Sequence, residues 1–279
     1  MILSKNNLYI VSTPIGNLDD ITLRAIDVLK NSDIILCEDT RRTLKLLNHL
    51  NVKKKLISYH KFNEKKQITS VIRHFNEGKI LSLVSDAGTP SLSDPGRFLV
   101  NECIRKKIQV TPIPGASSIT SAMSVSGFSD QFLFYGFLPK KEGEIDKVLE
   151  FLKMCKFSQV FFIQSKKINF YLKKFKKYYS GRKIMISKEI TKIHETHFRG
   201  NIDDFNLFDT SLKGEITVVI SDFKAILAKP NKMEIVNKIK KYLKKNSLKD
   251  TVELILKEDN LKKKDIYQLC LKIKNEKNN

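Results

Sequence analysis

The highest concentration of residues that can do chemistry lies at positions 82–96, which read S-L-V-S-D-A-G-T-P-S-L-S-D-P-G. The apolar run at residues 80–84 leads into this stretch. A buried strand that ends in a loop of small residues forms ligand sites in open α/β sheets, just beyond the carboxyl end of the strand. Gly88 permits close approach of the backbone to a ligand, and the Asp86 carboxylate can accept hydrogen bonds from hydroxyls or amines. We therefore predict that residues 86–89 bind a small ligand.

The second acid of this stretch has a structural explanation. Asp94 stands directly before Pro95, and an acid followed by proline is typical of the N-cap and first position of an α-helix. We therefore predict a helix over residues 95–105 that is capped by Asp94, and we leave Asp94 outside the site.

A second charged loop, residues 38–42 with the sequence E-D-T-R-R, follows the apolar run at residues 33–37. Two carboxylates beside two arginines at the end of a strand can move a proton and hold phosphates. The alternative is a helix start in which Asp39 or Thr40 is the N-cap and the arginines are solvated. The residue types do not separate these two interpretations.

Two further loops have the composition of ligand sites. One is the P-I-G-N turn at residues 14–17, and the other is P-I-P-G-A-S-S at residues 112–118, where free N–H groups at a helix start favour carbonyl or carboxylate oxygens. No G-x-G occurs among the eleven glycines and the P-loop pattern is missing, so the usual dinucleotide and mononucleotide fingerprints are excluded.

The elements that position these loops alternate between strand and helix, which indicates an α/β fold. Strands are expected at residues 8–13, 33–37, 56–58, 80–84, 108–111, 132–138, 159–164, 183–186 and 215–221, and helices at 65–76, 95–105, 116–126, 143–154 and 168–179. A linker is expected around Lys229, Pro230 and Asn231. Beyond it, residues 234–245, 248–257 and 262–273 are predicted to form a small helix-turn-helix-like tail.

The charge balance indicates a polyanionic partner. The chain of 279 residues carries 51 lysines and arginines against 30 acids, a net charge of +21, and nucleic acid is the obvious partner for it. An alternative is the composition bias of an AT-rich genome. Residues 140–183 hold 13 basic residues against 4 acids, and residues 231–279 hold 14 against 7, so the charge is concentrated in two regions and favours a binding surface.

The cysteines, histidines and apolar runs argue against several classes of protein. The four cysteines are scattered without a C-x-x-C, which fits reduced thiols and a cytoplasmic location. No apolar run reaches the roughly 18 residues of a membrane span, and we see no signal peptide. His194 and His197 lie in an alternating stretch, residues 193–198, where they would point to opposite faces of a strand; we therefore expect no metal site.

The set of motifs resembles the class III, tetrapyrrole methylase-like methyltransferases, and within them the ribosomal RNA small-subunit methyltransferase I family. The motifs are S-T-P-I-G-N-L at 12–18, E-D-T-R at 38–41, S-D-A-G-T-P at 85–90, P-I-P-G at 112–115, G-F-L-P at 136–139 and K-E-I-T-K-I-H-E at 188–195. The region of resemblance covers about four-fifths of the chain. One departure stands out: Gln164-Ser165-Lys166-Lys167 replaces an acid, a serine and a His-Arg pair of the family.

The resemblance implies an α/β protein with two lobes, residues 1–113 and 114–226, a cleft between them that holds S-adenosylmethionine, and a basic helical tail at 231–279. It implies 2′-O-methylation of a cytidine ribose in the decoding region of 16S rRNA, the small ribosomal subunit as partner, a homodimer, and neither metal nor membrane. The alternatives are a tetrapyrrole or other non-RNA substrate, and a non-catalytic RNA-binding assembly factor.

The same resemblance, carried over residue by residue, gives expected roles. The cofactor-binding residues would be Pro14, Gly16, Asp86, Ala87, Gly88, Ser117, Ser118, Phe137, Gln164 and Ile190. Asp39 and Glu189 are expected as catalytic bases, and Arg41 and Arg42 as groups that hold the phosphates beside the target.

Overall fold

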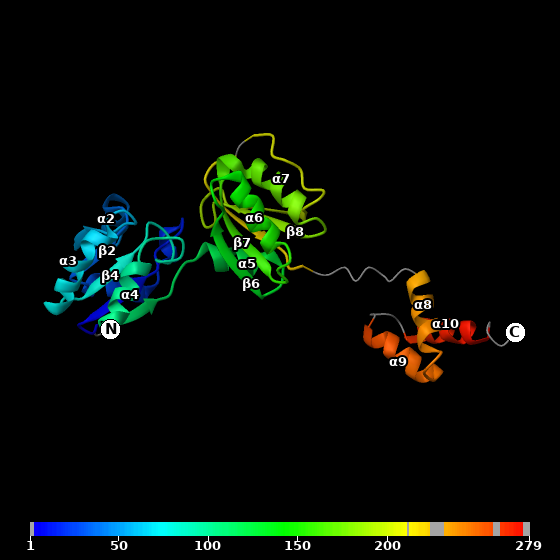
Figure 1. The fold of residues 1–279 in the computed structure, drawn as a ribbon. Coiled ribbons are helices and arrows are strands. Elements are labelled where there is room, and N and C mark those ends of the chain that lie inside the picture. The colour runs from blue at the N-terminus through cyan, green and yellow to red at the C-terminus, as the bar shows by residue number, and fades with distance from the viewer. Residues whose placement is uncertain (1–2, 211, 224–231, 259–262, 276–279) are drawn as a thin grey trace. The chain divides into compact units, whose positions relative to one another are not determined.

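The computed structural model describes residues 3–210, 212–223, 232–258 and 263–275, and the chain divides into two compact units, Met1–Phe223 and Lys224–Asn279 (Figure 1). The expected linker at residues 229–231 and the expected lobe end at residue 226 lie outside the described residues. The expected lobe boundary at residue 113 stays a prediction.

The first sheet is parallel throughout, and helices cover both of its faces. Its strands are β1 (Asn7–Val11), β2 (Ile34–Cys37), β3 (Lys55–Ser58), β4 (Leu81–Val84) and β5 (Gln109–Ile113), in the order β3-β2-β4-β1-β5. The helices are α1 (Leu23–Asn31), α2 (Thr40–His49), α3 (Glu64–Asn76) and α4 (Arg97–Arg105).

Neighbouring residues of one strand lie in different cores. Leu8 packs in a cluster with Phe75 and Leu99, from α3 and α4, whereas Tyr9 packs with Leu29 and Leu47, from α1 and α2. Because successive side chains of a strand point to opposite faces, both faces are buried, which explains why the central strands β1, β2 and β4 are short, mostly apolar runs.

The second sheet is mixed. Its order is β6-β7-β10-β8-β9, from β6 (Phe132–Phe137), β7 (Ser158–Gln164), β8 (Lys183–Lys188), β9 (Thr196–Asn201) and β10 (Glu215–Ile220). Among the paired strands that the structure describes in this sheet, only β6 and β7 run parallel to each other. Helices α6 (Glu142–Leu152) and α7 (Ile168–Tyr178) contribute to the core on one face, and α5 (Ser118–Ser126) packs against Val160, Met185 and Val219 from the sheet's strands.

The second unit is a small three-helix core. Helices α8 (Lys232–Tyr242), α9 (Leu248–Glu258) and α10 (Lys263–Asn275) bring together Ile239, Val252, Ile255 and Cys270, each at most 2% exposed. The expected α/β class with a helical tail is therefore confirmed. No helix within the described ranges of the chain is long and apolar enough to cross a membrane.

Two local predictions are wrong. Helix α4 begins at Arg97 and its N-cap is Gly96, not Asp94, because Gly96 has φ 127° and so breaks a helix that would otherwise run on from Pro95. A Cβ at Gly96 would lie 2.6 Å from side-chain atoms of Leu83 and Ser91, so glycine is required there. His194 also differs from the expectation, since β9 starts only at Thr196 and His194 lies before it.

Candidate functional site

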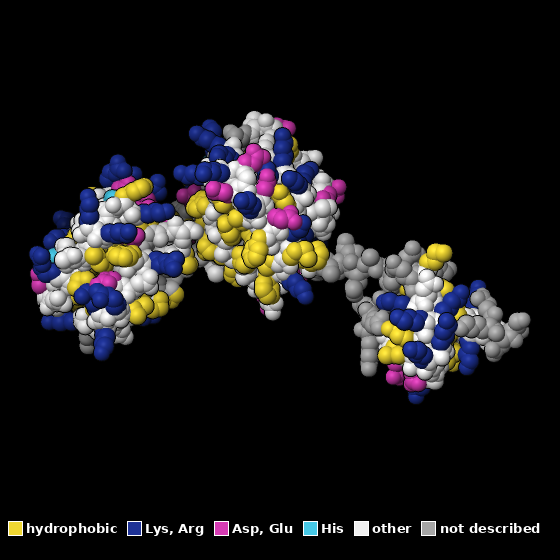
Figure 2. Space-filling view, viewed as in Figure 1, with side chains coloured by type: hydrophobic (Ala, Val, Ile, Leu, Met, Phe, Trp, Pro, Cys, Tyr) yellow, Lys and Arg dark blue, Asp and Glu magenta, His cyan; other side chains and the backbone are white. Residues whose placement is uncertain are grey.

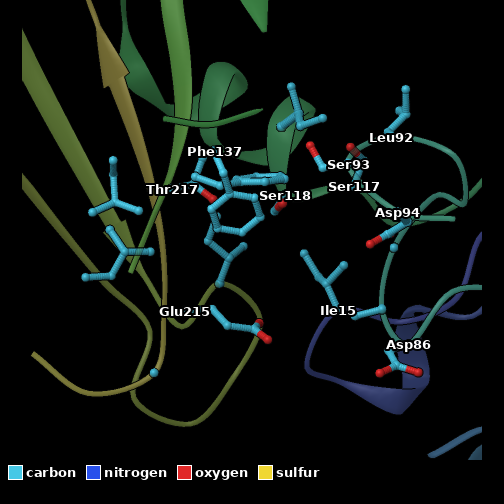
Figure 3. A pocket seen from close by; sticks show the side chains of 18 of the residues that line it. Ile15, Asp86, Leu92, Ser93, Asp94, Ser117, Ser118, Phe137, Glu215 and Thr217 are labelled. Atoms are coloured by element: carbon cyan, nitrogen blue, oxygen red, sulfur yellow. The ribbon is translucent and has the colours of Figure 1, made fainter. Parts of the chain in front are cut away.

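A cavity of about 580 Å³ lies within the first unit, and loops from both sheets line it (Figure 3). Because all strands of the first sheet are parallel, the loops that follow β1, β2, β4 and β5 leave from the same edge of the sheet. The lining residues are Ile15, Glu38, Arg42, Asp86, Ala87, Gly88, Thr89, Leu92, Ser93, Asp94, Ser117, Ser118, Ile119, Phe137, Phe162, Ile163, Gln164, Ser165, Lys166, Ile190, Gly214, Glu215, Ile216 and Thr217.

Most of the residues singled out in the sequence meet at this cavity. Those that line it are Arg42, Asp86, Ala87, Gly88, Ser117, Ser118, Phe137, Gln164 and Ile190. The other five predicted residues are not among the described residues that line the cavity: Pro14, Gly16, Asp39, Arg41 and Glu189. The roles of all fourteen remain predictions, and the structure shows where each side chain stands.

The loop after β4 is fixed against the end of β1. Thr13 N donates to the Gly88 carbonyl at 2.9 Å, and Gly88 N donates to the Thr13 carbonyl at 3.0 Å. The Ser85 hydroxyl donates to the Ala87 carbonyl at 3.2 Å, within the same turn. Gly88 has φ 76°, a conformation that a side chain disfavours. The loop is therefore held rigidly, and it presents its backbone and Asp86 to the cavity.

Asp86 joins the loops after β2 and β4. Its Oδ1 accepts a hydrogen bond from Asp39 N at 3.0 Å, and its Oδ2 lies 3.5 Å from Arg42 Nε. One side of the carboxylate is thus used in fixing the β2 loop. The Asp86 side chain retains 25% exposure, so a ligand can still reach it.

Gly16 lies where the loop after β1 meets the loop after β8, and its expected cofactor role stays a prediction. Asn17 N donates to Thr191 Oγ1 at 3.1 Å, and a Cβ at Gly16 would lie 2.7 Å from the same oxygen atom. Glycine is needed there so that the loop after β1 can approach the loop after β8. Its neighbour Ile15, which sequence reasoning passed over, is the residue that lines the cavity.

Carboxylates dominate the polar part of the cavity. Figure 3 shows the Asp94 and Glu215 side chains directed into it from different sides. Burial, together with the negative charge of Glu38, raises the pKa of Asp94 to about 6. Burial and the charge of Asp86 also raise the pKa of Glu38. The protonation state of Asp94 therefore changes only about one pH unit below neutral.

Sequence reasoning missed Asp94 because its helix-cap signal was stronger than its site signal. A usable signal was present: Ser-Asp occurs twice in the loop, as Ser85-Asp86 and as Ser93-Asp94. Both pairs sit among small residues that leave a ligand room.

Asp39 is held by its own helix. It is the N-cap of α2, and its Oδ1 accepts from Arg41 N at 2.9 Å and from Arg41 Nε at 3.0 Å, while its Oδ2 accepts from the same guanidinium at 2.6 Å. These bonds from Arg41 hold the pKa of Asp39 far below its usual range. The helix-cap interpretation of this loop is therefore the one realised at Asp39, and its carboxylate is a weak base.

Glu189 is likewise occupied. Its Oε1 accepts from Glu215 N at 2.8 Å and from Lys192 Nζ at 2.9 Å. Burial raises the pKa of Glu189, but the bond from the Glu215 backbone and the Lys192 ammonium outweigh burial, so the net shift is downward. The carboxylate stabilises the approach of the Gly214 turn, where a Cβ would clash with it.

The two cations of the cavity wall are Arg42 and Lys166. Lys166 belongs to the segment that departs from the family pattern. There β7 ends at Gln164 and a short 3-10 turn, Ser165–Lys167, follows. Gln164, Ser165 and Lys166 all line the cavity, so the departure retains a positive charge at this wall.

The cavity suits a nucleoside ligand that carries positive charge. Its volume falls in the range of small-molecule sites, roughly 300–1,000 Å³. Ile15, Phe137 and Ile190 supply apolar surface for an adenine ring. Asp86 and the other carboxylates can accept hydrogen bonds from ribose hydroxyls or an amine, and their negative charge attracts a sulfonium. The apolar walls and the carboxylate acceptors of the cavity therefore fit the chemistry of S-adenosylmethionine.

The class of protein follows from the fold and from comparison with known proteins. Residues 7–206 match the family model for Tetrapyrrole (Corrin/Porphyrin) Methylases. The structure of uroporphyrin-III C-methyl transferase from Thermus thermophilus, complexed with S-adenyl homocysteine, shares the fold with a TM-score of 0.55 and 15% identity, over 77% of this chain and 97% of that one. The chain therefore has the tetrapyrrole methylase fold.

Sequence relatives define the family more narrowly. The ribosomal RNA small subunit methyltransferase I of Mesomycoplasma conjunctivae is 44% identical over 84% of this chain and 98% of that protein. The protein of the same name from Rickettsia prowazekii is 40% identical over 97% of this chain and 98% of that protein. This chain belongs to the ribosomal RNA small subunit methyltransferase I family.

Proposed function

We propose that this chain transfers a methyl group from S-adenosylmethionine to the 2′-oxygen of a cytidine ribose in the decoding region of 16S rRNA. The observation that carries the proposal is one cavity in which carboxylates suited to a cationic cofactor share the wall with cations suited to RNA phosphates. The family resemblance supplies the target nucleotide, and the names of the relatives supply the small-subunit rRNA.

When bound, S-adenosylmethionine supplies a methyl group already activated on a sulfonium. The residues of the chain then have to bind, orient and keep water out. Ile15 and Phe137 would supply the apolar surface for the adenine, and the Asp86 carboxylate would accept hydrogen bonds from the ribose or the amine. Gly88 lets the loop backbone approach closely. Because the electrophile is activated, most of the rate enhancement is expected to come from alignment of the two reactants.

Asp94 is the proposed general base for the 2′-hydroxyl. It lines the cavity and has a pKa raised to about 6 by burial. A base is most effective when its pKa lies near the working pH, so Asp94 is better suited than Asp39 or Glu189, whose pKa values are lowered by their partners. Glu38, with its pKa also raised, is the second candidate.

Positive charge around the cavity and on the tail is proposed to hold the RNA. Arg42 and Lys166 lie at the cavity wall, and Arg41 has a side chain that is 87% exposed. Figure 2 shows lysine and arginine side chains distributed over the visible surfaces of the described units. The small ribosomal subunit is the proposed partner, and the homodimer implied by the superfamily stays a prediction.

The test is methyl transfer from radiolabelled S-adenosylmethionine to small ribosomal subunits, to naked 16S rRNA and to a porphyrinogen, followed by mapping of the labelled nucleotide. We expect one ribose-methylated cytidine. Labelling of the porphyrinogen alone would replace the proposal with a tetrapyrrole substrate. Cofactor binding without any transfer would favour a non-catalytic assembly factor.

Single-turnover rates of three variants test the base. Asp94→Asn is expected to be slowed by about 10²- to 10⁴-fold, the usual contribution of acid–base catalysis. Asp39→Asn and Glu189→Gln are expected to stay within about tenfold of the wild-type rate, since neither lines the cavity in the described structure. The reverse order would return the role to Asp39 or Glu189.

A further inference from the structure

One aromatic side chain of the first unit is almost fully exposed beside the site. Phe62 lies in the loop between β3 and α3 and is 92% exposed. A single exposed apolar residue is ordinary in itself. The meaning of Phe62 depends on whether the loop displays the ring in a fixed way and on what surrounds it.

The loop holds itself rigidly. Asn63 Oδ1 accepts from His60 N at 2.8 Å, and Asn63 Nδ2 donates to the Ser58 carbonyl at 3.0 Å. Phe62 N donates to His60 Nδ1 at 3.2 Å, and the two rings meet edge to face with centroids 6.1 Å apart. The backbone on both sides of Phe62 is thus tied down, and the ring is presented in a preorganised position.

The loop stands next to the loop that lines the cavity. Strands β2 and β3 are paired in parallel up to Cys37 and Ser58, and Tyr59 N donates to the Cys37 carbonyl at 2.8 Å. The chain therefore continues side by side into Glu38 on one strand and His60 on the other. His60 acts to lower the pKa of the lining residue Glu38, so the two side chains lie within electrostatic range of one another.

Cations accompany the aromatic ring. Lys61 and Lys65 are exposed within or directly after the loop, and Arg41 and Arg42 are exposed on the neighbouring one. An exposed aromatic ring with cations beside it matches single-stranded RNA, whose bases stack on aromatic side chains while phosphates meet lysine and arginine. A protein partner would be matched by a broader apolar patch, whereas the two residues directly before Phe62 are the half-buried His60 and the exposed Lys61.

We propose that the loop of residues 60–63 is a base-stacking site for an unpaired nucleotide of the RNA substrate, in the same strand as the methylated nucleotide. Phe62 stacks on the base, and the neighbouring cations Lys61 and Arg41 meet the phosphates. The proposal rests on the proposed function, because it assigns to this loop the RNA that the cavity acts on.

The experiment compares the full-length wild type with Phe62→Ala, Phe62→Leu and Phe62→Trp. The matched control is Phe151→Ala, which removes an 80% exposed phenyl ring at the end of α6. Four quantities are measured for each: the affinity for naked 16S rRNA, the affinity for small ribosomal subunits, the affinity for S-adenosylmethionine, and the single-turnover methylation rate.

Phe62→Ala is expected to weaken RNA binding by about 5- to 100-fold, the range reported by alanine substitution of stacking side chains. Phe62→Leu should show a similar loss, because it is apolar but has no aromatic face, and Phe62→Trp should retain wild-type affinity. Affinity for S-adenosylmethionine should not change, and Phe151→Ala should behave as wild type.

Equal RNA affinity of Phe62→Ala and Phe151→Ala would overturn the stacking site while leaving the proposed function intact. A loss confined to whole subunits, with naked RNA bound normally, would overturn it in favour of a protein contact. If the wild type transfers no methyl group to any RNA, both proposals fail together.

Discussion

Replacing Asp94 by asparagine is expected to make the protein more stable while it removes activity. Burial and the charge of Glu38 raise the pKa of Asp94 to about 6, against about 3.9 for an unperturbed aspartate. Each pKa unit corresponds to about 1.4 kcal/mol, so the shift of about two units would amount to ~3 kcal/mol in full burial. Asp94 is only half-buried, and solvent screening reduces this to about 1.5 kcal/mol.

The sign of this effect depends on pH. Above pH 6 Asp94 is ionised in both the folded and the unfolded chain, and the folded state bears the full penalty of the buried charge. As the pH falls from about 6 to about 4, the folded state binds the proton first, and the penalty disappears. Asp94→Asn has no such group, so its advantage over the wild type should be about 1.5 kcal/mol at pH 7.5 and close to zero near pH 4.

Differential scanning calorimetry at pH 4, 5.5 and 7.5 measures this difference. An advantage of about 1.5 kcal/mol corresponds to a rise in Tm of roughly 3–6 °C for a unit of this size. Asp130→Asn, at an exposed position, is the control for loss of an acid. A difference between wild type and Asp94→Asn that is zero at pH 7.5, or that is the same at all three pH values, would refute the argument from burial.

Three other perturbations test the site and the tail. Gly88→Ala should lower the free energy of unfolding by about 1–2 kcal/mol and weaken cofactor binding, because φ is 76° and the new Cβ would lie 3.2 Å from Ile15. The control is Gly143→Ala, in open space within α6, which should not lower the free energy of unfolding. Chemical denaturation and titration calorimetry compare the two variants. Asp39→Asn should leave cofactor affinity unchanged and destabilise α2 by less than about 1 kcal/mol, as seen in thermal melts, because asparagine is also a good N-cap. Replacing the four exposed lysines between residues 240 and 245 by glutamine should reduce the slope of log K against log salt for RNA binding by about 3, and an unchanged slope would exclude the tail from the RNA contact.

The fold was predictable because its local signals agree with each other. In the first sheet the central strands β1, β2 and β4 are short, mostly apolar runs buried on both faces, and in the tail the spacing of Ile235, Ile239, Val252 and Ile255 matches the helical period of a buried face. The placement of residues 86–89 at the cavity was predictable for a similar reason, since they come just after the buried strand β4. Loops after parallel strands must share an edge, whatever the rest of the fold.

The environment of each acid was not predictable, because it depends on partners that are distant in sequence or set by backbone geometry. Asp39 and Arg41 read equally well as reactive groups and as a helix start, and only the bidentate bond between them decides. Glu189 is held by the backbone of Glu215, which is 26 positions away. Asp94 was assigned to a helix that the positive φ of Gly96 starts two residues later.

The same placement of acids explains both the chemistry and its cost in stability. Glu38, Asp86 and Asp94 end up around one cavity because the loops after β2 and β4 leave neighbouring parallel strands. Their mutual repulsion and partial burial raise the pKa values of Glu38 and Asp94, which destabilises the folded chain at neutral pH. A ligand with net positive charge relieves that repulsion, so cofactor binding and folding stability are linked through the same carboxylates. A site that gathers acids in this way is therefore better matched to a cationic methyl donor than to its neutral product. The burial and the neighbouring Glu38 that make Asp94 more basic also destabilise the folded chain.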